Sequence, residues 1–121
     1  MSRPSLEVAV EINRAVRADN EWFHDPDDLD RVERAVNAIS ELTDAVEAAA
    51  VIAYRVTRAQ GFAEGNKRTA LLLARWVLDR NGLDGSRVIP PDDEQFADLL
   101  VKAASGTDVE RKLIHLLVSR R

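Results

Sequence analysis

The segment from Gln60 to Trp76, QGFAEGNKRTALLLARW, places several chemically active side chains within a few residues. An acid, Glu64, is followed by an amide and two bases, Asn66, Lys67 and Arg68. Two glycines permit backbone geometry that is closed to other residues and would let a ligand approach the main chain. A run of helix-forming apolar residues follows directly. We therefore expect these side chains on a short loop that leads into a helix.

The start of that helix would attract an anion. The amides of residues 66–69 would lack partners within the helix, and the helix dipole places positive charge at the same end. Lys67 and Arg68 add two full charges, and an arginine can hold a phosphate through two hydrogen bonds. The sequence therefore predicts a phosphate-binding cup formed by Gly65, Asn66 and these two bases.

Glu64 conflicts with a bound anion unless a cation lies between them. A Mg²⁺ ion coordinated by one carboxylate and by phosphate oxygens removes the conflict, so the segment suggests a nucleotide with Mg²⁺. The segment is not a Walker loop, because only three residues separate its glycines and Asn66 precedes the lysine. A plain turn with solvated charges explains the same composition, and the residue types alone leave both interpretations open.

Apolar residues spaced by three and four predict the helices that would position this loop. We expect a first helix within Pro4–Ala18 and a second over 26–40. A third, capped by Thr43 or Asp44, should run to about residue 60 and end at Gly61, and a fourth over 67–80 should be stopped by Asn81-Gly82. A connection over 83–91 precedes a helix that Asp92 or Asp93 caps and Gly106 ends. Thr107 and Glu110 predict a capping box for a last helix over 108–119. The fold class is therefore all-α, a bundle of about six helices with the loop between the two most apolar ones.

The whole chain sets wider limits. Its 121 residues favour a single domain over 1–121. A formal net charge of −4 disfavours nucleic acid and anionic lipid as partners. The absence of cysteine excludes thiolate metal sites, and no apolar run reaches the roughly 18 residues of a membrane helix. We expect a soluble, cytoplasmic protein.

The stretch GFAEGNKRTA resembles the signature of the Fic/Doc family, H-x-F-x-[D/E]-[G/A]-N-[K/G]-R. The matching residues, in order, are Phe62, Glu64, Gly65, Asn66, Lys67 and Arg68. The short length and the segments TALLLARWVLDRNG and ADLLVKAASG are similar to the death-on-curing (Doc) toxin branch. A lysine at position 67, where Fic enzymes usually have glycine, favours the same branch.

The resemblance implies a compact helical bundle with the motif between two central helices. It implies transfer of part of a nucleoside triphosphate to a protein hydroxyl, mostly AMP by Fic enzymes and phosphate by Doc, whose target is translation elongation factor Tu. By position, Glu64 would bind Mg²⁺, while Asn66, Lys67 and Arg68 would hold the phosphates of ATP or another triphosphate. Phe62 would pack under the loop. A small antitoxin whose tail covers the active-site side is an implied partner.

Two residues depart from the family pattern. Leu71 stands where Fic enzymes have a second arginine, which again favours the Doc branch over AMP transfer. Gln60 stands where the family has its general-base histidine, and an amide cannot take a proton at neutral pH. Because general-base help is worth about 10² to 10⁴ in rate, we expect weak or no activity. Gln60 could instead align a hydroxyl or a water molecule, as a glutamine does in some GTPases.

A natural alteration, an engineered inactivation and a repurposed enzyme would each explain Gln60. The alternative function is a catalytically inactive protein-binding or regulatory module. His24, beside Trp22 and Phe23, is the nearest substitute base, although a lone loop histidine is more often a surface residue. We expect His115 to be packed or exposed without a chemical role, and Arg75 and Arg80 to lie on a solvated helix face.

Overall fold

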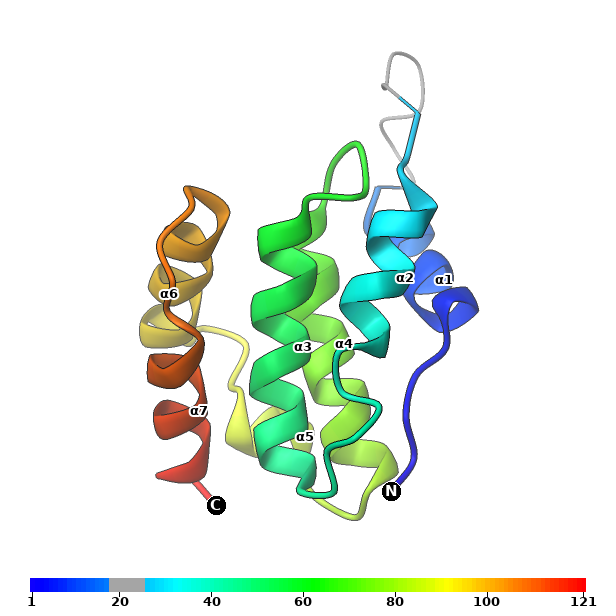
Figure 1. Ribbon diagram of the computed structural model, residues 1–121. Coiled ribbons are helices and arrows are strands. Elements are labelled where there is room, and N and C mark those ends of the chain that lie inside the picture. Colours follow the sequence, from blue (N-terminus) through cyan, green and yellow to red (C-terminus); the bar gives the residue numbers. More distant parts are fainter. Residues whose placement is uncertain (18–25) are drawn as a thin grey trace.

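The computed structural model describes residues 1–17 and 26–121. Within these residues the chain forms helices and no strands, which confirms the all-α class. Figure 1 shows the seven helices of the described residues: α1 (Leu6–Val16), α2 (Leu29–Asn37), α3 (Ala45–Ala59), α4 (Asn66–Arg80), α5 (Gly85–Val88), α6 (Glu94–Ala104) and α7 (Glu110–Val118). None of these helices combines the length and the apolar character that crossing a bilayer requires.

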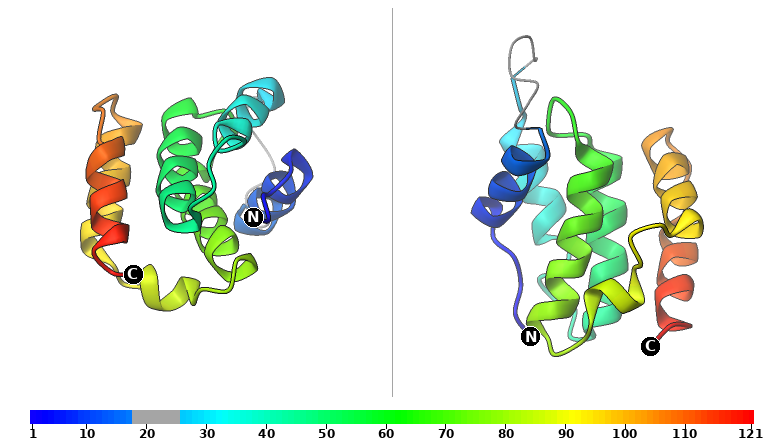
Figure 2. Two further views of the ribbon diagram at one scale, coloured as in Figure 1. Left: turned by 60° about the horizontal axis from the view of Figure 1, so that its bottom comes forward. Right: turned by 180° about the vertical axis from the view of Figure 1, so that it is seen from behind.

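The helices α3 and α4 run antiparallel through the middle of the bundle (Figure 1). On one side α2 packs on α3 and α1 packs on α4, while on the other side α6 and α7 pack on α3 (Figure 2). The short helix α5 joins the end of α4 to α6. Residues 60–65, the motif loop, connect the two central helices at one end of the bundle, as the sequence predicts.

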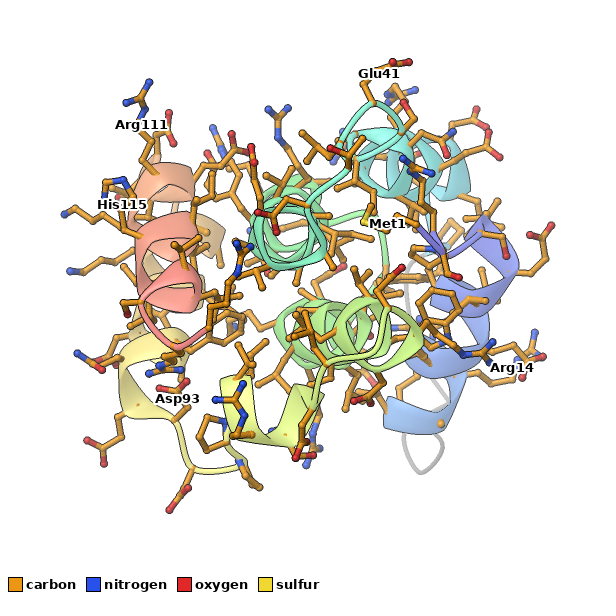
Figure 3. The ribbon with its side chains drawn as sticks, turned by 90° about the horizontal axis from the view of Figure 1, so that it is seen from below. Met1, Arg14, Glu41, Asp93, Arg111 and His115 are labelled. Carbon is orange, nitrogen blue, oxygen red and sulfur yellow. The ribbon has the colours of Figure 1, made fainter. Side chains whose placement is uncertain are left out.

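The central position of α3 follows from its small residues. Ten of its fifteen residues are buried, and Ala48, Ala49 and Ala53 have no exposed surface. Alanine side chains let neighbouring helices approach closely, so α3 can contact helices on both sides at once. Leu73 and Val77 of α4 are equally buried against it. Charged side chains such as Arg111 and Glu41 lie on the outside (Figure 3).

Several helix starts agree with the sequence. The side chain of Asp44 accepts a hydrogen bond from the amide of Val46 over 2.9 Å and caps α3. Asp93 accepts from the amide of Phe96 over 3.1 Å and caps α6. Both carboxylates satisfy amides that have no partner within the helix, which confirms the expected caps.

Two expected helix starts are wrong. The helix α2 begins at Leu29 rather than at Pro26, because Asp28 caps it while the Asp28 amide donates to the Gly61 carbonyl over 2.7 Å. The helix α7 begins at Glu110 without a side-chain cap, so the capping box of Thr107 is absent. Asp108 accepts from the Glu110 amide instead, over 3.2 Å.

The connection expected over 83–91 contains a further helix, α5. The carboxylate of Asp84 accepts from the amides of Ser86 and Arg87, over 3.1 and 3.2 Å, and thereby starts this single helical turn. Four residues are too few to show a helical spacing of apolar positions, so the described residues hold seven helices rather than about six.

Candidate functional site

The motif loop begins with a left-handed residue. The helix α3 ends at Ala59, and Gln60 follows with φ 47° and ψ 45°. We expected the helix to end at Gly61, but the left-handed turn comes one residue earlier. This conformation costs a residue with a Cβ atom roughly 1–2 kcal/mol, so other contacts must hold Gln60 in place.

One such contact is made by the Gln60 side chain. Its Nε2 atom donates to the carbonyl oxygen of Ala104 over 2.6 Å. Ala104 is the last residue of α6, where carbonyl groups have no partner within the helix. Gln60 therefore ties the motif loop to the end of α6, while its own surface remains exposed.

The Asn66 side chain closes the motif loop on itself. Its Oδ1 atom accepts from the Phe62 amide over 3.1 Å, and its Nδ2 atom donates to the Phe62 carbonyl over 2.9 Å. These two bonds satisfy both backbone groups of Phe62, whose ring is 3% exposed in the core. Both polar atoms of the Asn66 side chain are thus bonded to the loop, and its backbone amide is the first amide of α4.

The two glycines of the loop serve close packing. A Cβ atom on Gly65 would lie 2.9 Å from Val16 Cγ1 and 3.2 Å from Asn13 Nδ2, and the φ of Gly65 is 75°. A Cβ atom on Gly61 would lie 2.6 Å from Val32 Cγ2. The Cβ side of Gly65 is therefore packed against α1, and that of Gly61 against α2 and the residue before it.

The sequence reasoning missed Asn13. This side chain is 1% exposed, and its Nδ2 atom donates to the Glu64 carbonyl over 2.9 Å and to Thr69 Oγ1 over 3.1 Å. It therefore joins α1 to both ends of the Glu64–Thr69 turn. The signal was a single amide among the apolar residues of the first helix, since a polar residue is rarely buried without hydrogen-bond partners.

Asp27 is a second residue that the sequence reasoning missed. Its carboxylate accepts from the Ala63 amide over 2.8 Å and from both terminal nitrogens of Arg17, over 2.9 and 2.6 Å. Arg31 adds a hydrogen bond to the Ala59 carbonyl over 3.2 Å. The motif loop is thus held from α1 and from the residues that precede α2, while Arg31 of α2 holds the end of α3 directly before the loop.

The first turn of α4 carries the positive charge. Lys67 and Arg68 are exposed there, no acid occurs in the turn, and no side chain caps the helix. The Thr69 amide donates to the Gly65 carbonyl over 2.9 Å, so the expectation that it lacks a partner is wrong. Within α4, the amides of residues 66–68 precede this first hydrogen bond. Glu64 is partly buried and lies directly before this turn. It is not without an interaction partner.

A metal at this position would depend on Glu64 and on the oxygens of its ligand. Across residues 1–17 and 26–121, no three His, Cys, Asp or Glu side chains come together as a metal site. Mg²⁺ is commonly held by one or two carboxylates and by substrate phosphates, so the single acid beside the cationic turn fits this ion.

The other candidate residues lie elsewhere. His24, Trp22 and Phe23 fall outside the described residues. His115 is exposed on the outer face of α7 (Figure 3). Arg80 is exposed, as expected of a surface residue. Its Cζ atom lies 4.9 Å from the centre of the Trp76 ring. The expectation for Arg75 is wrong, because it is partly buried and its Nε atom donates to the Ile89 carbonyl over 2.9 Å.

Comparison with known proteins agrees with this geometry. A sequence model of the Fic/DOC family matches residues 5–78, which include α1 to α3, the motif loop and nearly all of α4. The chain therefore belongs to the Fic/DOC family, and its helical bundle is consistent with the Fic fold. No curated protein matches the chain.

Proposed function

We propose that the chain binds a Mg²⁺-nucleotide, ATP or another triphosphate, at the motif loop and the first turn of α4. The phosphates would be held by Gly65, by the side chains of Lys67 and Arg68, and by the amides of residues 66–68. Glu64 would coordinate Mg²⁺. One observation carries this proposal: α4 starts with three amides before its first hydrogen bond, no cap, no acid and two exposed bases. Family membership supports it, because Fic proteins generally use such a nucleotide.

The reaction that we propose is transfer of the γ-phosphate to a hydroxyl group of a protein. The hydroxyl oxygen would attack phosphorus, the bond from phosphorus to the bridging oxygen would break, and the hydroxyl proton would need an acceptor. Leu71 and Lys67 support the Doc branch and phosphate transfer over AMP transfer. A translation factor is the proposed target and a small antitoxin the proposed partner.

Gln60 would impair this reaction. Its amide is a poor base, and its Nε2 atom already donates to the Ala104 carbonyl. A missing general base lowers a rate by about 10² to 10⁴, whereas positioning and charge stabilisation would remain. Under this proposal the chain binds the nucleotide well and transfers phosphate slowly.

The bond from Gln60 to Ala104 also favours a second candidate function. Under this second function, Gln60 has a structural role and the chain is a non-enzymatic, protein-binding or regulatory module. Under either function we propose one domain over 1–121 and a cytoplasmic location. The single domain is supported by the direct packing of α6 and α7 on α3.

Replacement of Gln60 separates the two functions. Histidine and asparagine both tolerate the left-handed conformation better than most residues, but only histidine can act as a base near neutral pH. We would incubate each variant with Mg²⁺ and γ-labelled ATP in the presence of purified elongation factor Tu. Gln60→His should raise transfer by about 10² or more, while Gln60→Asn should not.

Two other outcomes are decisive. The first is nucleotide binding by the unmodified protein and by both variants, with no transfer by any of the three. This result would favour the non-enzymatic module. Absence of Mg²⁺-ATP binding by all three would contradict the nucleotide site itself.

A further inference from the structure

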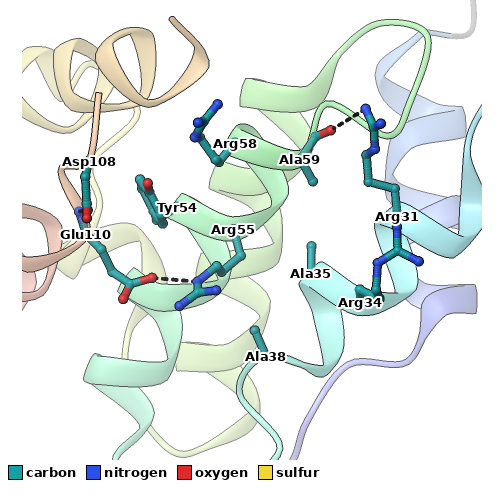
Figure 4. A pocket seen from close by; sticks show the side chains of 10 residues that line it. All are labelled: Arg31, Arg34, Ala35, Ala38, Tyr54, Arg55, Arg58, Ala59, Asp108 and Glu110. Carbon is teal, nitrogen blue, oxygen red and sulfur yellow. Dashed lines mark hydrogen bonds and ion pairs between the residues drawn. The ribbon is translucent and has the colours of Figure 1, made fainter. Parts of the chain in front are cut away.

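A cleft of about 420 Å³ lies on the outer face of α3 (Figure 4). The helix α2 forms one wall, and the start of α7 with the residues before it forms the other. Four arginines line this arginine cleft: Arg31 and Arg34 from α2, and Arg55 and Arg58 from α3. Four arginines in one cleft are notable in a chain whose net charge is −4.

Two of these arginines are engaged and two are not. Arg31 donates to the Ala59 carbonyl, and Arg55 pairs with Glu110 over 2.7 Å, as the dashed lines in Figure 4 show. Arg34 and Arg58 are exposed, and neither makes a hydrogen bond or an ion pair with any residue that the structure describes. Two unneutralised guanidinium groups therefore face the same cleft.

The floor between these charges is partly apolar. Tyr54 is 8% exposed and Ala35 is 6% exposed, and both line the cleft. Arginine and tyrosine are the residue types that most often dominate binding energy at protein interfaces. An apolar floor beneath exposed guanidinium groups suits a peptide that carries both carboxylate and small apolar side chains.

We infer that the arginine cleft docks an acidic segment of a protein partner. Carboxylates are the ligands that guanidinium groups bind through paired hydrogen bonds. The cleft volume accommodates a few side chains, and Asp108 on the α7 wall would repel a continuous polyphosphate backbone. Spaced carboxylates can avoid this acid, so a protein segment fits better than nucleic acid.

The arginine cleft reaches the motif loop along the chain. Arg58 and Ala59 line the cleft, and Gln60 follows them directly. An acidic segment bound to Arg58 would thus lie close to the motif loop, which the bond from Gln60 to Ala104 ties to α6. Docking at the cleft does not depend on nucleotide binding, so its test needs no nucleotide.

The test uses a fluorescein-labelled ten-residue peptide of alternating glutamate and alanine, with anisotropy as the readout. The unmodified protein should bind it, and the double variant Arg34→Glu, Arg58→Glu should bind at least about tenfold more weakly. The control Arg80→Glu reverses one charge outside the cleft, against two in the double variant, and should bind within about twofold of the unmodified protein. If charge reversal lowers the melting temperature, the milder double variant Arg34→Gln, Arg58→Gln is measured in its place.

Three results would overturn the inference. The first is no binding of the acidic peptide at millimolar concentration. The second is equal weakening by the cleft variants and by Arg80→Glu, which would indicate attraction to the whole surface. The third is tighter binding of a ten-nucleotide thymidine strand that also depends on Arg34 and Arg58, because the cleft would then be a nucleic-acid site.

Discussion

Gln60 Nε2 lies 2.6 Å from the carbonyl oxygen of Ala104, and this hydrogen bond joins the motif loop to the end of α6. Residue 104 lies outside the segment 5–78 that the family model matches. The bond therefore links the family motif to the α6–α7 pair of helices. It also accounts for a glutamine held in the left-handed conformation at this position.

The first prediction concerns the backbone of Gln60. Gln60→Gly and Gln60→Ala both remove the bond to Ala104, but only glycine adopts the left-handed conformation without a steric cost. The glycine variant should therefore be more stable than the alanine variant by about 1 kcal/mol. Urea denaturation of the two variants measures this difference. Equal stability, or a more stable alanine variant, would show that residue 60 is not left-handed in solution.

The second prediction compares two left-handed glycines. Gly65 has a φ of 75° and packs against Val16, whereas Gly82 has a φ of 83° and no atom within 4 Å of the point where a Cβ atom would lie. Gly82→Ala should cost only the backbone strain, about 1 kcal/mol, and Gly65→Ala should cost at least about 1–3 kcal/mol more. Thermal or urea unfolding gives both values. Similar losses would mean that α1 does not pack tightly on the motif loop.

The third prediction concerns the closure of the motif loop by Asn66. Asn66→Ala removes two hydrogen bonds and leaves the backbone groups of Phe62 without partners, so it should destabilise the fold by about 1–3 kcal/mol. Asn37→Ala, at the exposed end of α2, is the matched control and should stay within about 0.5 kcal/mol of the original stability. Equal effects of the two substitutions would contradict closure of the motif loop by the Asn66 side chain.

The fourth prediction concerns acid stability. Burial would raise the pKa of Asp93, but hydrogen bonds from Arg120 and from the Phe96 amide outweigh it, so this pKa lies below its ordinary value of 3.8. A carboxylate with a lowered pKa stabilises the fold above its unfolded pKa, and this stabilisation is lost as the pH falls through the folded value. Asp93→Asn keeps a capping side chain and loses the charge, so it should destabilise the protein near neutral pH.

The pH dependence provides the check. The stability gap between the original protein and Asp93→Asn should stay constant from about pH 7 to about pH 5 and shrink below about pH 4. Asp98→Asn, on the exposed face of the same helix, should show no comparable gap. A gap that is independent of pH down to about pH 3 would contradict the role of the Asp93 charge.

The sequence predicts the bundle well because its long helices carry strong local signals. The apolar spacing of α2, the alanines of α3 and the capping carboxylates of Asp44 and Asp93 each act within one or two turns. The short helix α5 escaped prediction, because one turn shows no periodicity. The capping box of Thr107 failed because Asp108 accepts from the Glu110 amide in its place.

The site is less predictable because its contacts are distant in sequence. Lys67 and Arg68 follow from local composition, but Asn13 contacts residues 51 and 56 positions away and Gln60 reaches 44 positions ahead. Such pairings depend on how α1 and α6 pack on the central helices. The same reason explains the close packing of Gly61 and Gly65, whose neighbours lie in α1, in α2 and in the residue before α2.

The most direct test of the central claim is calorimetric titration of the protein with ATP in the presence of Mg²⁺. We predict saturable binding that Arg68→Ala weakens at least about tenfold, since a hydrogen bond to a charged group is worth about 1.5–3 kcal/mol. Arg80→Ala, at the other end of α4, should leave the affinity within about twofold. Absence of binding, or equal losses in the two variants, would contradict a nucleotide site at the start of α4.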